Sequence, residues 1–278
     1  MGSKTFGPIG VLGLYTETPL HCGAESGTGY VDLPIQRERH TNYPVIPGST
    51  LKGVLRDEMG LDEGLIKKYF GSADEKGKEG SGNPGIVSFG DGIVVAFPIR
   101  SSGAPFHWIT CPFVLERIFR AIGRAETFTD PAKGTAQAKS EGKVLLEEIV
   151  VEEKRSPLFD NNGCLCELLD LLPSSETFGY TRKIFLERLL IVTNEDFKLL
   201  IDTGTEVLTR IKLNDKGTTG NMFVEEVVPP ETLFLVPLRA IAQSGFDMEK
   251  IPKVIRVGGD ETIGRGVMHV STITIKGA

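Results

Sequence analysis

The 278-residue sequence lacks several features that would place it in a familiar class of protein. It has four cysteines, and none of them belongs to a C-x-x-C pair. Cys164 and Cys166 stand alone, whereas structural zinc sites usually show two spaced pairs of ligands, so reduced structural thiols are expected. No apolar run approaches the roughly 18 residues that a membrane span needs, and residues 1–8 lack the apolar core of a signal peptide. We therefore expect a cytoplasmic protein that does not contact a membrane.

Positive charge is also scarce, because 37 acidic residues outnumber 31 lysines and arginines and leave a net charge of −6. Overall charge is therefore excluded as the basis of nucleic-acid binding, and such binding would need local basic stripes and backbone amides. Glycine, in contrast, is abundant at 33 residues, where average usage of about 7% would give about 20. We expect several backbone segments that need positive φ or a close approach to a ligand.

Short strand patterns and a few helical patterns follow one another along the chain. Strands are expected at 8–20, 144–152, 188–192, 232–238, 254–257 and 267–275. Helices are expected at 49–58, 61–70, 111–124 and 194–201. Two hairpins are predicted, one around Gly90-Asp91-Gly92 and a longer one pairing 206–213 with 222–228. Polar loops are expected at 21–47 and 71–84, and the order of elements favours an α+β domain over a doubly wound sheet.

A glycine-rich run from Gly258 to Gly266 lies between the last two predicted strands. Gly259 and Gly264 have the spacing of a P-loop, but Arg265 replaces its lysine and a strand follows instead of a helix. A strand–loop–strand of this kind can bring backbone amides close to a phosphate chain, with Arg265 as a charged clamp. Two interpretations stay open. The run contacts RNA through Gly258, Gly259, Gly264, Arg265 and Gly266, or it is merely a tight turn.

A second candidate site combines the polar loop 21–47 with the helix start that follows it. The first N–H groups of this helix are free to bind a phosphate, and a local basic stripe surrounds them. A solvated helix face is the commoner fate of such cations, but the coincidence of helix start, glycine-rich loop and basic stripe favours an RNA backbone. The residues expected to contact RNA here are Arg37, Arg39, Ser49, Thr50, Lys52 and Arg56.

Acid–base candidates lie in the same loop and on the long hairpin. Asp32 stands between two apolar residues, where a carboxylate beside a phosphate can hold a divalent ion or act as a general base on a ribose hydroxyl. His21 is a second acid–base candidate. Glu225 and Glu226 are further carboxylates, which on a hairpin are commonly just solvated charges. An isolated Asp or His is more often structural than catalytic.

Five stretches between residues 8 and 275 form one combination: His21-x-Gly23, Asp32-Leu-Pro-Ile-Gln-Arg-Glu38, Pro44-x-x-Pro-Gly-Ser-x-Leu-Lys-Gly53, the segment 223–232 and Gly258–Gly266. This combination resembles the RAMP superfamily of CRISPR proteins and, more narrowly, the backbone subunit of the Cmr, or type III-B, effector complex. The stretches that begin at Asp32 and Pro44 are the most specific, the glycine-rich run marks only the superfamily, and Cys22 and Thr50 are mild departures.

The resemblance implies one domain over 1–278, with a ferredoxin-like (RRM-related) core, a lid-like insertion at about 100–143 and a thumb β-hairpin at about 205–230. It implies several copies stacked on one guide RNA beside other Cmr subunits. Each copy would be an endoribonuclease that cuts the paired single-stranded target RNA once, at regular intervals, with a divalent metal ion, Mg²⁺ or Mn²⁺, present.

By residue, the resemblance places Asp32 on the cleavage aspartate of the family and makes it a possible metal ligand. His21 falls on a nearby histidine, Glu225 and Glu226 on an acidic pair near the thumb, and Lys52 with the Ser49 helix start on guide-RNA contacts. Two alternatives stay open, a non-catalytic RNA-binding scaffold and a guide-processing ribonuclease of the same superfamily.

Overall fold

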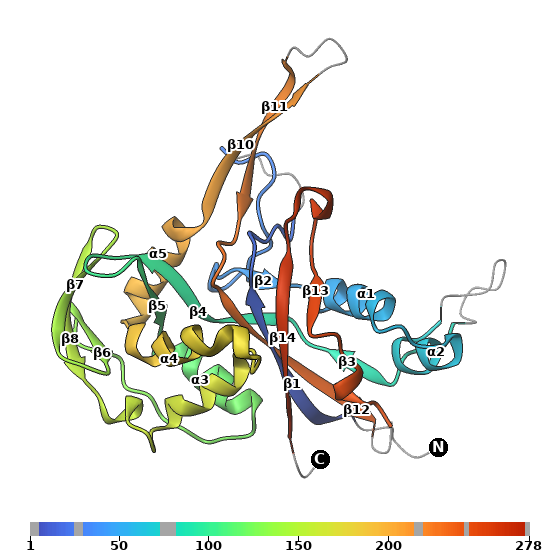
Figure 1. Cartoon of the computed structure of the whole chain (residues 1–278), viewed down its shortest axis with the longest axis horizontal. Helices are drawn as coiled ribbons and strands as arrows, with labels where there is room; N and C mark the ends of the chain where they lie inside the picture. Colours follow the sequence, from blue (N-terminus) through green and yellow to red (C-terminus); the bar gives the residue numbers. More distant parts are fainter. Residues whose placement is uncertain (1–5, 25–29, 73–81, 214–218, 242–244, 276–278) are drawn as a thin grey trace.

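The computed structural model describes residues 6–24, 30–72, 82–213, 219–241 and 245–275 (Figure 1). One large sheet contains the strands β1 (Phe6–Thr16), β2 (Val45–Ile46), β3 (Val87–Phe89), β4 (Gly92–Arg100), β5 (Phe106–Thr110), β6 (Thr135–Ala138), β7 (Gly142–Leu146), β8 (Ile149–Arg155), β9 (Leu189–Ile191), β12 (Leu233–Ile241), β13 (Val254–Arg256) and β14 (Val267–Thr274). A separate two-stranded ribbon pairs β10 (Glu206–Leu213) with β11 (Thr219–Val227).

The helices are α1 (Gly48–Glu58), α2 (Glu63–Phe70), α3 (Pro112–Ala121), α4 (Gly179–Arg188) and α5 (Asn194–Gly204). Shorter 3₁₀ segments are η1 (Pro157–Phe159), η2 (Cys164–Leu171), η3 (Glu176–Phe178), η4 (Met248–Lys250) and η5 (Glu261–Ile263). None of the helices in the described ranges is long and apolar enough to cross a membrane.

The main sheet runs in the order β13-β14-β1-β12-β4-β5-β9-β6-β8-β7. Its pairs are antiparallel except β5 with β9 and β6 with β8. The interior strand β1 lies between β12 and β14, and its side chains Val11, Leu12 and Leu14 are fully buried. A strand that is buried on both faces reads as a nearly continuous apolar run, as this segment does. The result is a mixed α and β molecule with a mostly sheet core, which agrees with the expected α+β class.

Most of the predicted elements are present within a few residues of their expected bounds. The long hairpin is confirmed as β10–β11, with Val207 opposite Glu226 and Ile211 opposite Met222. Figure 1 shows this ribbon projecting away from the main sheet. Its tip at 214–218, and most of the predicted loop 71–84, lie outside the described residues.

The predicted hairpin around Gly90-Asp91-Gly92 is wrong. The strands β3 and β4 both pair with β12, at Leu238↔Phe89 and Leu235↔Ile93, so they lie end to end along one edge of that strand. The glycine-rich step between them does not reverse the chain, because the Gly90 N–H donates to the Pro237 carbonyl at 2.9 Å.

The single strand expected at 144–152 is also wrong, since the segment forms the hairpin β7–β8. Its turn contains Glu147 with φ of 50°, a left-handed conformation that propensities do not reveal for glutamate. The segment 100–143 contains β5, α3 and β6, and both strands are part of the main sheet.

Candidate active site

Asp32 lies at the base of the β10–β11 ribbon, on the outer edge of β11. Its backbone N–H donates to the Val224 carbonyl at 3.0 Å, and its Oδ2 accepts from the Val224 N–H at 2.8 Å. The next residue, Leu33, forms a bridge with Glu225. The loop therefore adds a short strand-like segment to the ribbon and holds an exposed carboxylate there, and Oδ1 has no hydrogen-bond partner among the described residues.

His21 is buried beside the same part of β11. Its Nδ1 lies 2.8 Å from the Glu226 carbonyl oxygen and 3.6 Å from Glu225 Oε1. A carbonyl oxygen only accepts, so Nδ1 donates this hydrogen bond and Nε2 is the ring nitrogen left for a ligand. A Cβ on Gly23 would lie 2.9 Å from Nε2, so the absence of a side chain at Gly23 leaves that nitrogen uncovered.

Glu225 is 1% exposed and binds cations that come from other elements. Arg265, from the glycine-rich loop, donates to Glu225 Oε2, and Arg210 of β10 lies 3.8 Å from the same oxygen. Both arginines also approach Asp260, at 3.4 and 3.9 Å. The guanidinium of Arg265 is itself buried, and its charge is paired with Glu225 inside the protein. Contact of Arg265 with RNA stays a prediction.

Glu226 is the second acidic residue of the pair, and it ties the polar loop to the ribbon. Its Oε1 accepts from Arg37 at 2.6 Å and from the Thr205 hydroxyl at 2.7 Å, while its Oε2 accepts from the Ile35 N–H at 3.1 Å. Burial raises the pKa of the Glu226 carboxyl, but the hydrogen bonds and charge of Arg37 outweigh burial, and the pKa lies below its ordinary value. Glu226 is therefore held ionised as an anchor.

The polar loop is fixed from its other side by α3. Arg117 donates two hydrogen bonds to Glu38, at 2.5 and 2.9 Å, and Thr41 adds a third at 2.6 Å. Burial raises the pKa of the Glu38 carboxyl, yet these bonds bring it below its ordinary value. Arg39, in contrast, is exposed. The sequence did not point to Arg117 or Thr205, because their partners lie 79 and 21 positions away.

The glycine-rich loop lies against the loop that carries His21. The Gly259 N–H donates to the His21 carbonyl at 2.9 Å, and the Gly266 N–H donates to the Pro19 carbonyl at 3.0 Å. Gly258 has φ of 89°, and a Cβ there would lie 2.3 Å from the His21 carbonyl oxygen. Glycine is therefore required for this close approach. Gly264, at φ of 83°, is exposed.

The helix start on α1 differs from the expectation in one respect. The Gly48 N–H is taken by Asp91 Oδ1 at 2.8 Å, so this first donor is not free for a phosphate. Ser49 is exposed and Thr50 half-buried, while Lys52 and Arg56 reach into a cleft beside α1. Sequence reasoning missed Asp91 as a helix cap because it lies 43 positions from Gly48.

Within the described ranges, no group of three or more His, Cys, Asp or Glu side chains is arranged to hold a metal ion. Asp32 supplies a single carboxylate, while Glu225 and Glu226 are committed to arginines. Mg²⁺ commonly binds one or two carboxylates together with water and substrate phosphates. The side chains of the described residues alone therefore do not form a metal centre.

The structure thus brings together His21, Asp32, Glu225 and Glu226, although the first two and the last two are separated by about 190 to 205 positions. A model of the RAMP superfamily matches residues 14–269. The chain is 35% identical over 289 aligned positions to the CRISPR system Cmr endoribonuclease Cmr4 of Pyrococcus furiosus, and the match covers 94% of each chain.

Solved structures agree with this match. The crystal structure of oligomeric Cmr4 from Pyrococcus furiosus gives a TM-score of 0.69 at 28% identity, covering 97% of this chain and 99% of that one. A chain of the type III-B Cmr-beta complex bound to cognate target RNA gives 0.72 at 20% identity, over 96% and 98%, which supports the fold alone. The chain therefore belongs to the RAMP superfamily and, within it, to the family of the Cmr4 endoribonucleases.

Proposed function

We propose that this chain is the backbone subunit of a type III-B CRISPR effector complex, in which it binds guide RNA and cuts the paired target RNA at regular intervals. The observation that carries the proposal is the exposed carboxylate of Asp32, a residue that one backbone and one side-chain hydrogen bond hold on β11 at the base of a projecting ribbon. The family relationship supports an endoribonuclease. Several copies would stack along one guide RNA beside other Cmr subunits.

The finer architecture fits this role. The ribbon 205–230 would be the thumb, since it projects from the sheet and carries exposed apolar side chains at Val207, Ile211 and Met222. Such side chains can wedge between bases and open a base pair of the guide–target duplex beside Asp32. The ferredoxin-like core and the lid-like insertion at 100–143 remain part of the proposal, although β5 and β6 of that segment are also strands of the main sheet.

In the proposed reaction, Asp32 Oδ1 takes the proton from a ribose 2′-hydroxyl of the splayed target nucleotide. The 2′-oxygen then forms a bond to the adjacent phosphorus, and the bond from phosphorus to the 5′-oxygen breaks. A protonated His21 would return a proton from Nε2 to the leaving oxygen, while its Nδ1 stays bonded to the Glu226 carbonyl. The products are a 2′,3′-cyclic phosphate and a 5′-hydroxyl.

Glu225 and Glu226 act in this proposal as anchors and not as bases. Each is buried and bound to an arginine, which leaves neither carboxylate free to accept a proton from RNA. Glu226 fixes the loop that carries Asp32, and Glu225 connects the glycine-rich loop to His21. The glycine-rich loop then shapes the floor of the RNA path through its exposed backbone at Gly259 and Gly264.

Dependence on a divalent ion, Mg²⁺ or Mn²⁺, is also proposed. Asp32 and the RNA phosphates would have to supply its ligands, because the described side chains form no metal centre. When bound, such an ion would neutralise charge on the phosphate. None of the proton transfers assigned above to Asp32 and His21 depends on it.

The proposal is tested by measuring target-RNA cleavage, assembly and RNA binding of a complex reconstituted with Asp32→Asn subunits. Lost target cleavage with intact assembly and intact RNA binding is the expected result. Glu148→Gln, at an exposed carboxylate of the β7–β8 turn, is the matched control and should cleave normally. Lost assembly would favour the scaffold alternative, in which Asp32 only holds the loop. Cleavage of precursor guide RNA by the isolated chain would favour the processing alternative.

A further inference from the structure

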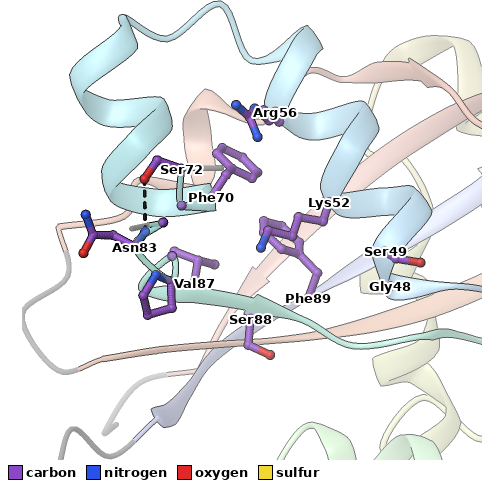
Figure 2. Close-up of a pocket in the computed structure, with 14 residues that line it drawn as sticks. Gly48, Ser49, Lys52, Arg56, Phe70, Ser72, Asn83, Val87, Ser88 and Phe89 are labelled. Atoms are coloured by element: carbon purple, nitrogen blue, oxygen red, sulfur yellow. Dashed lines mark hydrogen bonds between the residues drawn. The ribbon is translucent and has the colours of Figure 1, made fainter. Parts of the chain in front are cut away.

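A cleft of about 820 Å³ lies between α1, α2 and β3, away from Asp32 (Figure 2). Figure 2 shows Lys52 and Arg56 on α1 at one side, Ser72 and Asn83 at the other, and Phe70 and Phe89 between them. None of the fourteen described residues that line the cleft is acidic. In a chain of net charge −6, this absence marks the cleft as a place for an anion.

The two cations are one helical turn apart on α1 and are available to a ligand. Within the described part of the chain, no carboxylate lies within 4 Å of Lys52 or Arg56. The helix start is a poorer anion site, because Asp91 already accepts from the Gly48 N–H. Electrostatics therefore place a phosphate between Lys52 and Arg56 and not at the end of the helix.

The floor of the cleft is aromatic. The rings of Phe70 and Phe89 lie parallel, with centroids 5.5 Å apart and an interplanar angle of 6°. Phe70 is 3% exposed and belongs to the core, whereas Phe89 is only half-buried and offers its surface to the cleft. A phosphate alone would need no such floor, but a nucleobase would gain stacking and apolar contact from it.

The wall opposite α1 is built from backbone. The Ser72 N–H donates to the Asn83 carbonyl at 2.9 Å, and the Asn83 N–H donates to the Ser72 hydroxyl at 3.1 Å. Gly71 has φ of 90°, and a Cβ there would lie 2.6 Å from the Asn83 carbonyl oxygen. These two hydrogen bonds fix the wall on this side, and the volume of the cleft is typical of pockets for small molecules.

We propose that this cleft takes one nucleotide of single-stranded RNA, with the phosphate between Lys52 and Arg56 and the base against Phe89. The inference rests on the proposed function and deepens it, since it adds a base subsite to a contact otherwise made with the RNA backbone. Stacking on phenylalanine tolerates every base, as a guide of arbitrary sequence requires. An acidic protein segment would use the cations and leave the aromatic floor without a role.

Two RNA probes separate the phosphate from the base. The full-length chain is titrated with a uridine oligomer and with an oligomer of the same length made of abasic ribose phosphates. Lys52→Ala should weaken the binding of both. Phe89→Leu keeps an apolar side chain but removes the stacking surface, so it should weaken only the uridine oligomer, by about 10-fold. Equal effects of Phe89→Leu on both probes, or none on either, overturn the base subsite.

A measurement on the unmodified chain guards against misfolding of the variants. A uridine oligomer carrying 4-thiouridine is crosslinked by light, and the attached peptide is mapped. Crosslinks to the segment containing Phe89 or Phe70 are expected, and crosslinks confined to other segments contradict the proposal. If the full-length chain binds neither probe, the proposed RNA-binding function itself has failed. Normal binding without any effect of Lys52→Ala would overturn the cleft alone and admit an acidic protein as its occupant.

Discussion

Replacing Glu226 by Gln tests whether this carboxylate anchors the polar loop 21–47 or takes part in RNA cleavage. The side chain is 10% exposed and accepts from Arg37, Thr205 and Ile35. Glutamine keeps the size but offers one acceptor oxygen and no charge, so one donor loses its partner. Among the described residues, Asp202 at 3.8 Å is then the carboxylate left beside Arg37, which also donates to the Asn42 carbonyl and the Thr205 hydroxyl. We expect the free energy of unfolding to fall by about 2–3 kcal/mol.

Urea unfolding of the isolated chain measures this loss, and Glu148→Gln should stay within about 0.5 kcal/mol of the unmodified protein. A double-mutant cycle with Arg37→Ala should give a coupling free energy of about 1.5–3 kcal/mol. Where the variant is fully folded, complexes containing Glu226→Gln should still cut target RNA. Unchanged stability together with abolished cleavage would refute the anchoring role and make Glu226 part of the chemistry.

Further predictions concern three other places. Gly23→Ala puts a Cβ 2.9 Å from His21 Nε2, so target cleavage should slow without loss of stability, whereas Gly53→Ala, where a Cβ meets nothing within 4 Å, should cleave normally. Asp91→Ala should lower the free energy of unfolding by about 1 kcal/mol in urea, because the Gly48 N–H loses its acceptor. The folded pKa of Glu226 is lowered, so its contribution is fully present above its unfolded pKa of about 4.3 and is lost as pH falls through the folded value. The stability difference between the unmodified chain and Glu226→Gln, followed by urea unfolding across pH, should therefore be constant near neutrality and shrink in acid.

The sequence predicted those helices and strands in which a regular spacing of apolar residues extends over several residues. The β10–β11 ribbon and the strand β14 were predictable, because alternating β-favouring residues extend over their length. The helix α4 was missed because its apolar residues Ile184, Phe185 and Leu186 are consecutive and do not follow a helical spacing. The step at Gly90–Gly92 has the composition of a tight turn, but its conformation is decided by pairing with β12.

The residues of the candidate site were predictable, but their roles were not. Asp32 and His21 stood out by type and by family resemblance, while the sequence could not show that Asp32 binds the backbone of Val224, 192 positions away. Arg265 and Arg37 read as RNA contacts because unpaired arginines usually are exposed. Their partners, Glu225 and Glu226, are brought to them only by the fold.

The central claim is that Asp32 removes a ribose proton and so cuts the target RNA. The most direct measurement is an analysis of the fragment ends made by the reconstituted complex with unmodified subunits and with Asp32→Asn subunits. We expect regularly spaced fragments with 2′,3′-cyclic phosphate and 5′-hydroxyl ends from the first complex, and none from the second while guide and target stay bound. Fragments with 3′-hydroxyl ends, or undiminished cleavage by the Asp32→Asn complex, would contradict it.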